Sequence, residues 1–359
     1  MGFNRMFIRN AIDRSAESGT DRRSLLRAFG LAGAGAAAGS AALAGLGADA
    51  ATAEEGGPSD GAILNFALNL EYLEAEFYQR AAFGRGLDES LTDGRGTQGR
   101  VRGGKKVPFQ SKVVRQYAEE IAKDELEHVR FLRQALGSAK VAEPAIDINE
   151  AFTAAARAAG VIGPGETFDA YANDTNFLLA AYIFEDVGVT AYKGAAPLVD
   201  NKTFVDAAAG ILAVEAYHAS ELRTTLYAKG QDTPALIEGA NKISAARGQL
   251  DNGKDQGIQV DGAANIVPAD KNAIAFGRTP GEVLNIVYLN PGTVSRGGFF
   301  PDGVNGPIRS SGKAPTTGGA DTGAGDAAGD QGTTPHTATS GTGGDPSHQR
   351  RLDQNGDQK

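Results

Sequence analysis

Two pairs of residues in the middle of the chain place a histidine three positions after a glutamate. These pairs are Glu125 with His128 and Glu215 with His218. Because residues three apart lie on one face of a helix, each pair presents a carboxylate and an imidazole together. The chain has no cysteine, so any metal must bind through oxygen and imidazole, ligands that suit iron, manganese or zinc. The spacing therefore indicates a site for transition-metal ions.

Two further glutamates, Glu71 and Glu185, each lie in a run of apolar residues. A tyrosine follows each of them seven residues later, at Tyr78 and Tyr192. The sequence thus repeats one order, a glutamate with a tyrosine and then a Glu-x-x-His pair. A buried carboxylate without a partner costs several kcal/mol even after relaxation. Four carboxylates and two imidazoles on buried faces therefore need neutralisation, which two divalent cations would supply.

Each signal has a plainer explanation when taken alone. One Glu-x-x-His pair arises by chance and usually lies on a solvated face, and a lone glutamate in an apolar strip can be a satisfied core residue. The repetition of both patterns favours the metal site. Glu74, one turn after Glu71, is either an extra carboxylate near the site or a solvated or interhelical residue. For Tyr78 and Tyr192 we favour packed rings that hydrogen-bond inner carboxylates, with a catalytic redox role as the alternative.

Four long segments with apolar residues at steps of three and four carry these side chains, a pattern typical of helices with one buried face. They span about residues 60–82, 109–136, 174–193 and 202–229. A loop rich in Gly, Arg and Lys (84–107) joins the first two, and a short link (197–201) joins the last two. The long stretch 137–173, with a short helix near 149–159, connects the two hairpins. This order predicts an all-α, ferritin-like antiparallel four-helix bundle.

The N-terminal region, residues 1–53, has the features of an export signal. Arg22 and Arg23 lie in Thr-Asp-Arg-Arg-Ser-Leu-Leu, close to the twin-arginine pattern, and an Ala/Gly-rich stretch follows at about 28–46. Small-residue cleavage sites fit near residues 48–53. We expect export to the periplasm, the cell envelope or the extracellular space, without stable membrane insertion after signal removal. An uncleaved anchor or a disordered leader is the alternative.

The rest of the chain divides by composition into three parts. The bundle is predicted at residues 54–230, and a loop-rich C-terminal extension at 231–308. Residues 309–359 are mainly Gly, Thr, Ser, Asp and Pro, with almost no large apolar side chain, so we predict a disordered tail. His336 and His348 fall in this tail, where we expect solvated side chains rather than ligands. The formal net charge of −9 is spread out without a basic stripe, so no nucleic-acid partner is expected.

This arrangement of glutamates and histidines along four helices resembles that of the ferritin-like di-iron carboxylate superfamily, which includes bacterioferritin and rubrerythrin. The resemblance covers about residues 60–229 and implies two iron ions as cofactors, or alternatively two manganese ions. It implies six metal ligands: Glu71, Glu125, His128, Glu185, Glu215 and His218. In this resemblance Glu71 and Glu185 are terminal carboxylates, Glu125 and Glu215 bridge the metals, and each histidine binds one of them.

A narrower resemblance, to the desiccation-related ferritin-like proteins of plants, bacteria and fungi, covers more of the chain. It rests on residues 65–78 (NFALNLEYLEAEFY), 265–270 (NIVPAD), 276–280 (FGRTP) and 283–288 (VLNIVY). The last two segments also have a local explanation. Thr279, Pro280 and Glu282 predict the capped start of a short helix. We expect its apolar residues, Val283, Ile286 and Val287, to pack on the bundle.

Three functions fit these patterns. The first is a ferroxidase or peroxide-consuming oxidase that protects against desiccation or oxidative stress, with peroxide or dioxygen as the oxidant. The second is a di-manganese catalase-like enzyme, although manganese catalases do not generally carry two such symmetrical Glu-x-x-His pairs. The third is a non-catalytic stress protein whose metals only brace the bundle. Iron storage in a hollow shell fits less well, because the long loop, the extension and the tail add bulk.

Overall fold

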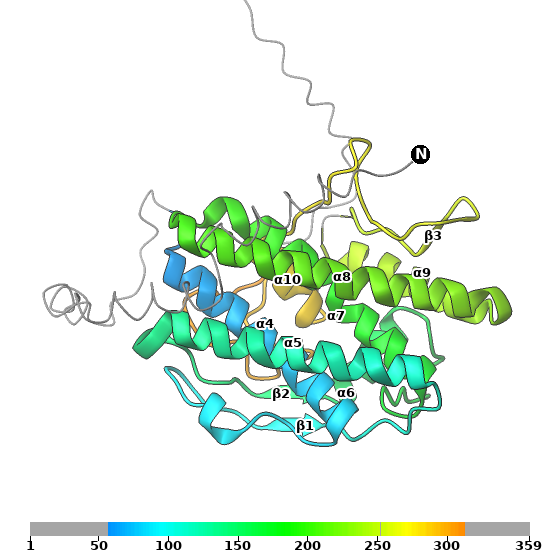
Figure 1. Ribbon diagram of the computed structural model, residues 1–359, viewed down its shortest axis with the longest axis horizontal. Coiled ribbons are helices and arrows are strands. Elements are labelled where there is room, and N and C mark those ends of the chain that lie inside the picture. The colour runs from blue at the N-terminus through cyan, green and yellow to red at the C-terminus, as the bar shows by residue number, and fades with distance from the viewer. Residues whose placement is uncertain (1–56, 252, 313–359) are drawn as a thin grey trace, which may run out of the picture. The chain divides into compact units, whose positions relative to one another are not determined.

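The computed structural model describes residues 57–251 and 253–312 (Figure 1). The predicted export signal and residues 313–359 of the predicted tail, with His336 and His348, lie outside these residues. The helices and strands are, in order, α4 (Asp60–Phe83), β1 (Val101–Gly103), α5 (Lys112–Leu136), β2 (Ile146–Ile148), α6 (Glu150–Ala158), α7 (Asp174–Ala195), α8 (Lys202–Asp232), α9 (Ala235–Leu250), β3 (Gln259–Val260), β4 (Ala263–Ala264) and α10 (Pro280–Val287). Among the described helices, none is long and apolar enough to cross a membrane.

The four long helices begin at side chains that satisfy free backbone N–H groups. At α4, the Ser59 hydroxyl accepts a hydrogen bond from the backbone N–H of Ala62. The corresponding residues at the starts of α5, α7 and α8 are Ser111, Asn173 and Asn201. Gly84 ends α4 with a φ of 76°, a left-handed conformation that glycine adopts without steric penalty. These local signals explain why the observed bounds fall close to those predicted from apolar periodicity.

The helices form the two predicted hairpins. α4 packs mainly against α5, and α7 packs mainly against α8, while α6 and β2 lie in the long connection between the hairpins (Figure 1). The minor strands form two small sheets, with β1 parallel to β2 and β3 antiparallel to β4. The predicted ferritin-like four-helix bundle is therefore confirmed, and the protein is mostly helical.

Burial differs between the two helices of each hairpin. α4 and α7 are buried on nearly all sides, whereas α5 and α8 each bury a single face. Many aromatic residues of the core come from α4 and α7. Phe77 of α4 stacks on Phe177 of α7, with ring centroids 5.6 Å apart. The inner surface of the bundle is thus formed by two wholly buried helices and two amphipathic ones.

The C-terminal extension contains more regular structure than we predicted. Helix α9 was missed, although Leu236, Ile237, Ala240 and Ile243 follow a helical spacing and are buried. The predicted capped helix is confirmed as α10. There the side chains of Thr279 and Glu282 each accept a hydrogen bond from the other's backbone N–H. Its residues Val283, Ile286 and Val287 are buried, and α10 contacts α7. Residues 309–312 also belong to the described chain, and Ser311 is buried.

A buried ion network ties the extension to the bundle. One carboxylate oxygen of Asp186, on α7, lies 2.7 Å from a guanidinium nitrogen of Arg223 on α8 and 2.7 Å from one of Arg247 on α9. Asp255 lies 3.0 Å from Arg247 and 2.5 Å from Arg278, and Arg278 also pairs with Asp251. All these side chains are buried, with 3% of the Asp255 side chain exposed. Three arginines thus join α7, α8, α9 and the following loop.

Asn69 and Asn305 form a second link between distant parts of the chain. The buried Asn69 side chain donates to the carbonyl of Asn305 at 2.8 Å and accepts from its N–H at 2.9 Å. The Asn305 side chain donates in turn to the carbonyls of Thr97 and Ala142. This arrangement, the Asn69–Asn305 clasp, satisfies a polar side chain inside α4 with backbone from the end of the extension.

Candidate metal centre

All four long helices direct acidic or imidazole side chains into the middle of the bundle. α4 supplies Glu71 and α7 supplies Glu185, each from a wholly buried helix. The two amphipathic helices supply the Glu-x-x-His pairs on their buried faces. The four glutamates are 0% exposed, and His128 and His218 are 8% and 6% exposed. The structure therefore brings all six predicted ligand residues inside the fold.

These side chains form two groups that share one member. Ligand atoms of Glu71, Glu125, His128 and Glu215 all lie within 4.8 Å of one another, as do those of Glu125, Glu185 and His218. Glu125 belongs to both groups. Each group combines carboxylate oxygens with one imidazole nitrogen, which is the donor set that the sequence predicted for each of two metal ions.

Glu125 lies between the two imidazoles. Its Oε2 atom is 3.3 Å from Nδ1 of His128, and its Oε1 atom is 3.1 Å from Nδ1 of His218. Glu71 and Glu185 complete the two sides, because Glu71 Oε2 lies 3.2 Å from the His128 nitrogen and Glu185 Oε2 lies 3.4 Å from the His218 nitrogen. Each half therefore has its own terminal carboxylate and its own imidazole, with Glu125 in common.

Several polar atoms of this cluster form no hydrogen bond with the described residues. Both carboxylate oxygens of Glu185 and of Glu215, Oε1 of Glu125 and Nδ1 of His218 are buried without a hydrogen bond. Each such group costs about 1–3 kcal/mol when it is left unsatisfied. Since these atoms belong to one cluster of oxygen and nitrogen donors, the residues fit a pair of bound cations.

The pKa values of the clustered side chains differ strongly from those of exposed glutamates and histidines. Burial raises the pKa of Glu71 to about 7, and burial together with the neighbouring carboxylates raises the pKa of Glu215 well above its usual value. Burial alone would lower the pKa of His128, but Glu71 and Glu125 outweigh it and raise this pKa to about 11. Without cations the cluster therefore holds protons, which metal ions would displace.

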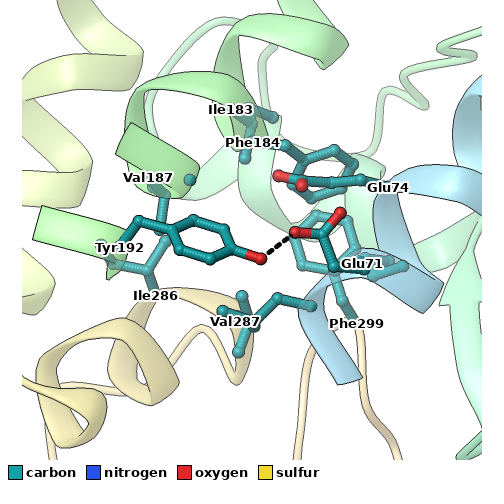
Figure 2. Close-up of a pocket in the computed structure, with 12 residues that line it drawn as sticks. Glu71, Glu74, Ile183, Phe184, Val187, Tyr192, Ile286, Val287 and Phe299 are labelled. Atoms are coloured by element: carbon teal, nitrogen blue, oxygen red, sulfur yellow. Dashed lines mark hydrogen bonds between the residues drawn. The ribbon is translucent and has the colours of Figure 1, made fainter. Parts of the chain in front are cut away.

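The two predicted tyrosines differ in their contacts. Tyr192 donates a hydrogen bond from its hydroxyl to Oε1 of Glu71, as Figure 2 shows. Burial and the nearby Glu185 carboxylate raise the pKa of Tyr78 well above its usual value, but its hydroxyl has no hydrogen-bond partner among the described residues. The predicted bond to an inner carboxylate is thus confirmed for Tyr192 and is not found for Tyr78. A catalytic role for either ring stays a prediction.

Glu74, which the sequence left open, is buried beside the cluster with 6% of its surface exposed. The solvated alternative is therefore wrong. Burial, followed by the carboxylates of Glu125, Glu185 and Glu71, raises its pKa well above the usual value. Glu74 and Glu71 line the same cavity, together with apolar side chains of α7, of α10 and of the loop that follows α10 (Figure 2).

Two residues that matter for the geometry were missed. Gly188, one turn after Glu185, leaves the space that Glu215 occupies, because a Cβ atom at Gly188 would overlap Oε2 of Glu215. A glycine inside a helix costs about 1 kcal/mol relative to alanine, so its presence in α7 was an available signal. Asp124 Oδ2 lies 3.2 Å from Nε2 of His218. Its position directly before Glu125 carried no clear signal, since neighbours in sequence point to different sides of a helix.

Comparison with known proteins decides the family. Residues 59–228, which include all six predicted ligands, match the model of the ferritin-like domain. Desiccation-related protein PCC13-62 of Craterostigma plantagineum is 35% identical over 267 residues, 69% of this chain and 83% of that protein. This chain belongs to the desiccation-related ferritin-like family. Ferritin-like catalase Nec2 of Nesocodon mauritianus is 28% identical over 265 residues, 68% of this chain and 83% of that protein. No solved structure matches the chain.

Proposed function

We propose that this member of the desiccation-related ferritin-like family binds two iron ions and uses them to consume peroxide. The observation that carries the proposal is the convergence of unpartnered carboxylate and imidazole atoms in two groups joined by Glu125. The similarity to a protein named as a ferritin-like catalase supports peroxide as the oxidant. The same similarity favours one second candidate, a catalase-type reaction with two manganese ions.

The residues divide between the two metal positions as follows. Glu71 and His128 would hold one ion, and Glu185 and His218 the other, with Glu125 between them. We assign Glu215 as the second bridge, although its shortest contact with an imidazole is to His128, at 3.9 Å from Nδ1. When bound, two such ions supply a two-electron couple to one oxidant molecule.

The chain's own side chains would hold this site dry and oriented. Tyr192 fixes Glu71 by its hydrogen bond, and Phe184, Val187 and Ile286 form apolar walls around that carboxylate (Figure 2). Exclusion of water strengthens the electrostatic interactions inside the site and limits side reactions. Burial and the neighbouring carboxylates raise the pKa of Glu74, which favours its neutral form and limits the negative charge beside the cluster.

The test is the reaction of the ferrous protein with peroxide. Two ferrous ions become ferric, while peroxide accepts two electrons and two protons, its O–O bond breaks and two water molecules form. We expect the loaded protein to consume about one peroxide per iron pair within seconds. Stopped-flow absorbance measures the rate of this oxidation. Replacing either His128 or His218 with alanine should slow the reaction by about two orders of magnitude or more with the helices intact.

Two controls separate the candidate functions. Ferrous ion in the same buffer sets the background rate, and a fully loaded protein that reacts no faster would rule out the oxidase and leave the bracing function. Protein loaded with manganese is then given excess peroxide in an oxygen electrode. Sustained oxygen release there, with slow single-turnover oxidation of the iron form, would assign the catalase-type reaction instead.

We also propose that the protein is exported by the twin-arginine pathway, from the pattern around Arg22 and Arg23. Replacing both residues with lysine should leave the precursor in the cytoplasm, because the pathway recognises the arginine pair. Fractionation followed by immunoblotting measures this, and mass spectrometry of the secreted protein should place its N-terminus between about residues 49 and 54. Normal export of the lysine variant would contradict the proposal.

A further inference from the structure

The two halves of the candidate centre differ at the outer nitrogen of each histidine. Both imidazoles face the cluster through Nδ1. On the other side of the ring, Nε2 of His218 meets the carboxylate of Asp124 at 3.2 Å. Asp124 directly precedes Glu125, and the residue in the same place before Glu215 is Val214. The repeat that makes the two halves alike is therefore broken at this pair of positions.

A cleft of about 590 Å³ lies between α5 and α8 and reaches His128. Val214 lines it, together with Phe131 and Ile211, so its inner part is apolar. On the rim, Glu127 and Arg130 of α5 form an ion pair with atoms 2.6 Å apart, and the exposed Asp206 of α8 adds a negative charge. The His128 half thus faces a cleft with an apolar interior, whereas a carboxylate covers the outer side of the His218 half.

The residues of α8 keep this cleft open. Ala207 and Gly210 lie one turn apart and both line it, and a Cβ atom at Gly210 would meet nothing within 4 Å. Space remains between α5 and α8 because these positions carry almost no side chain. The cavity beside Glu71 and Glu74 on the other side of the bundle measures about 20 Å³, room for about one water molecule.

We propose that the α5–α8 cleft is the access port of the centre, through which small oxidants and small anions reach the metal position beside His128. The position beside His218, covered by Asp124, is the closed one. The inference rests on the proposed function, because it presupposes a bound metal pair. Beyond that function, the port defines the path by which an oxidant enters and the metal position that it reaches first. The apolar interior suits a small uncharged molecule such as peroxide, and the cleft volume of about 590 Å³ also admits a small anion such as azide.

The test fills the port without touching the cluster. Ala207→Phe and Gly210→Phe add a ring inside the cleft. Ala209→Phe adds the same ring to the same helix at an exposed position that does not line the cleft, so it is the matched control. The probe is azide, whose binding to the ferric protein is followed by stopped-flow absorbance. Iron content and helical circular dichroism are measured first for every variant.

Filling a port should change rates and leave the equilibrium alone. We expect both association and dissociation of azide to slow by about tenfold or more in the two cleft variants, with the Kd within about twofold of the wild type. The Ala209→Phe protein should behave like the wild type. A distorted centre would instead change the Kd, so the two rates and their ratio separate blockage from damage.

Other outcomes overturn the inference in distinguishable ways. Unchanged azide rates in both cleft variants at full iron content would reject the port and leave the proposed function standing. A weakened Kd in both would show that the cleft residues act by distorting the cluster, which also rejects the port. A wild-type protein that binds no metal pair would reject the proposed function, and the port with it.

Discussion

Replacing Glu125 with glutamine should abolish the binding of both metal ions. The two oxygens of this buried carboxylate face the two imidazoles, at 3.3 Å from His128 and 3.1 Å from His218, so each metal position loses a charged ligand. Glutamine keeps the shape and removes the charge. Elemental analysis after reconstitution with ferrous iron should fall from about two ions per chain to well under one.

The matched control is Glu120→Gln, which makes the same change on the exposed face of α5 and should keep the full complement. Gly188→Ala is a second test of metal binding, because the added methyl group would displace the Glu215 carboxylate. Helix propensity alone would make this variant more stable by about 1 kcal/mol. A Glu125→Gln protein that retains two tightly bound ions would contradict the assignment of Glu125 as a shared ligand.

Replacing Arg247 with methionine should lower the free energy of unfolding by about 3–5 kcal/mol. This buried side chain donates to the carbonyl of Tyr182 at 2.6 Å and to the carboxylates of Asp186 and Asp255 at 2.7 and 3.0 Å. Its guanidinium also lies 4.6 Å from the ring centroid of Tyr182. Methionine fills much of the volume but leaves buried carboxylates short of a partner. Urea unfolding followed by circular dichroism measures the loss.

Lys242→Met on the same helix is the control. Lys242 pairs with Glu238 at 2.6 Å, but both side chains are exposed, at 43% and 65%. Exposed pairs of this kind contribute little to stability, so this variant should unfold close to the wild-type midpoint. Similar unfolding midpoints for the two variants would show that the arginine network does not hold the extension to the bundle. Because Asp186 directly follows Glu185, the same network also fixes the part of α7 that carries a candidate ligand.

The sequence predicted the bundle and its six candidate ligands because both depend on spacing along one helix at a time. Glu71 and Glu185 stood out as acids in apolar runs, and the repeat of Glu-x-x-His reinforced them. Asp124 and Gly188 were missed because their roles arise from contacts between helices, with His218 and with Glu215, that periodicity does not describe. Helix α9 was missed for another reason. Its apolar residues have helical spacing in the sequence, but they lie in a segment that we predicted to be rich in loops.

The location of Glu74 also required the folded structure. It lies on α4, where nearly every residue is buried, so helical periodicity could not separate an inner face from an outer one. Many neighbours of Glu74 come from other parts of the fold, and only their packing shows that this carboxyl group is enclosed rather than solvated. Wholly buried helices thus limit pattern reasoning more than amphipathic ones such as α5.

The Asn69–Asn305 clasp has a consequence for the order of folding during synthesis. Asn69 belongs to the first helix of the bundle, but its buried amide is satisfied by backbone that follows 236 positions later. The ribosome releases both hairpins before it releases residue 305. Until then α4 carries a polar side chain inside the core with part of its hydrogen bonding missing. Contacts this distant close slowly, so we expect the packing of α4 to be completed only after residue 305 has left the ribosome.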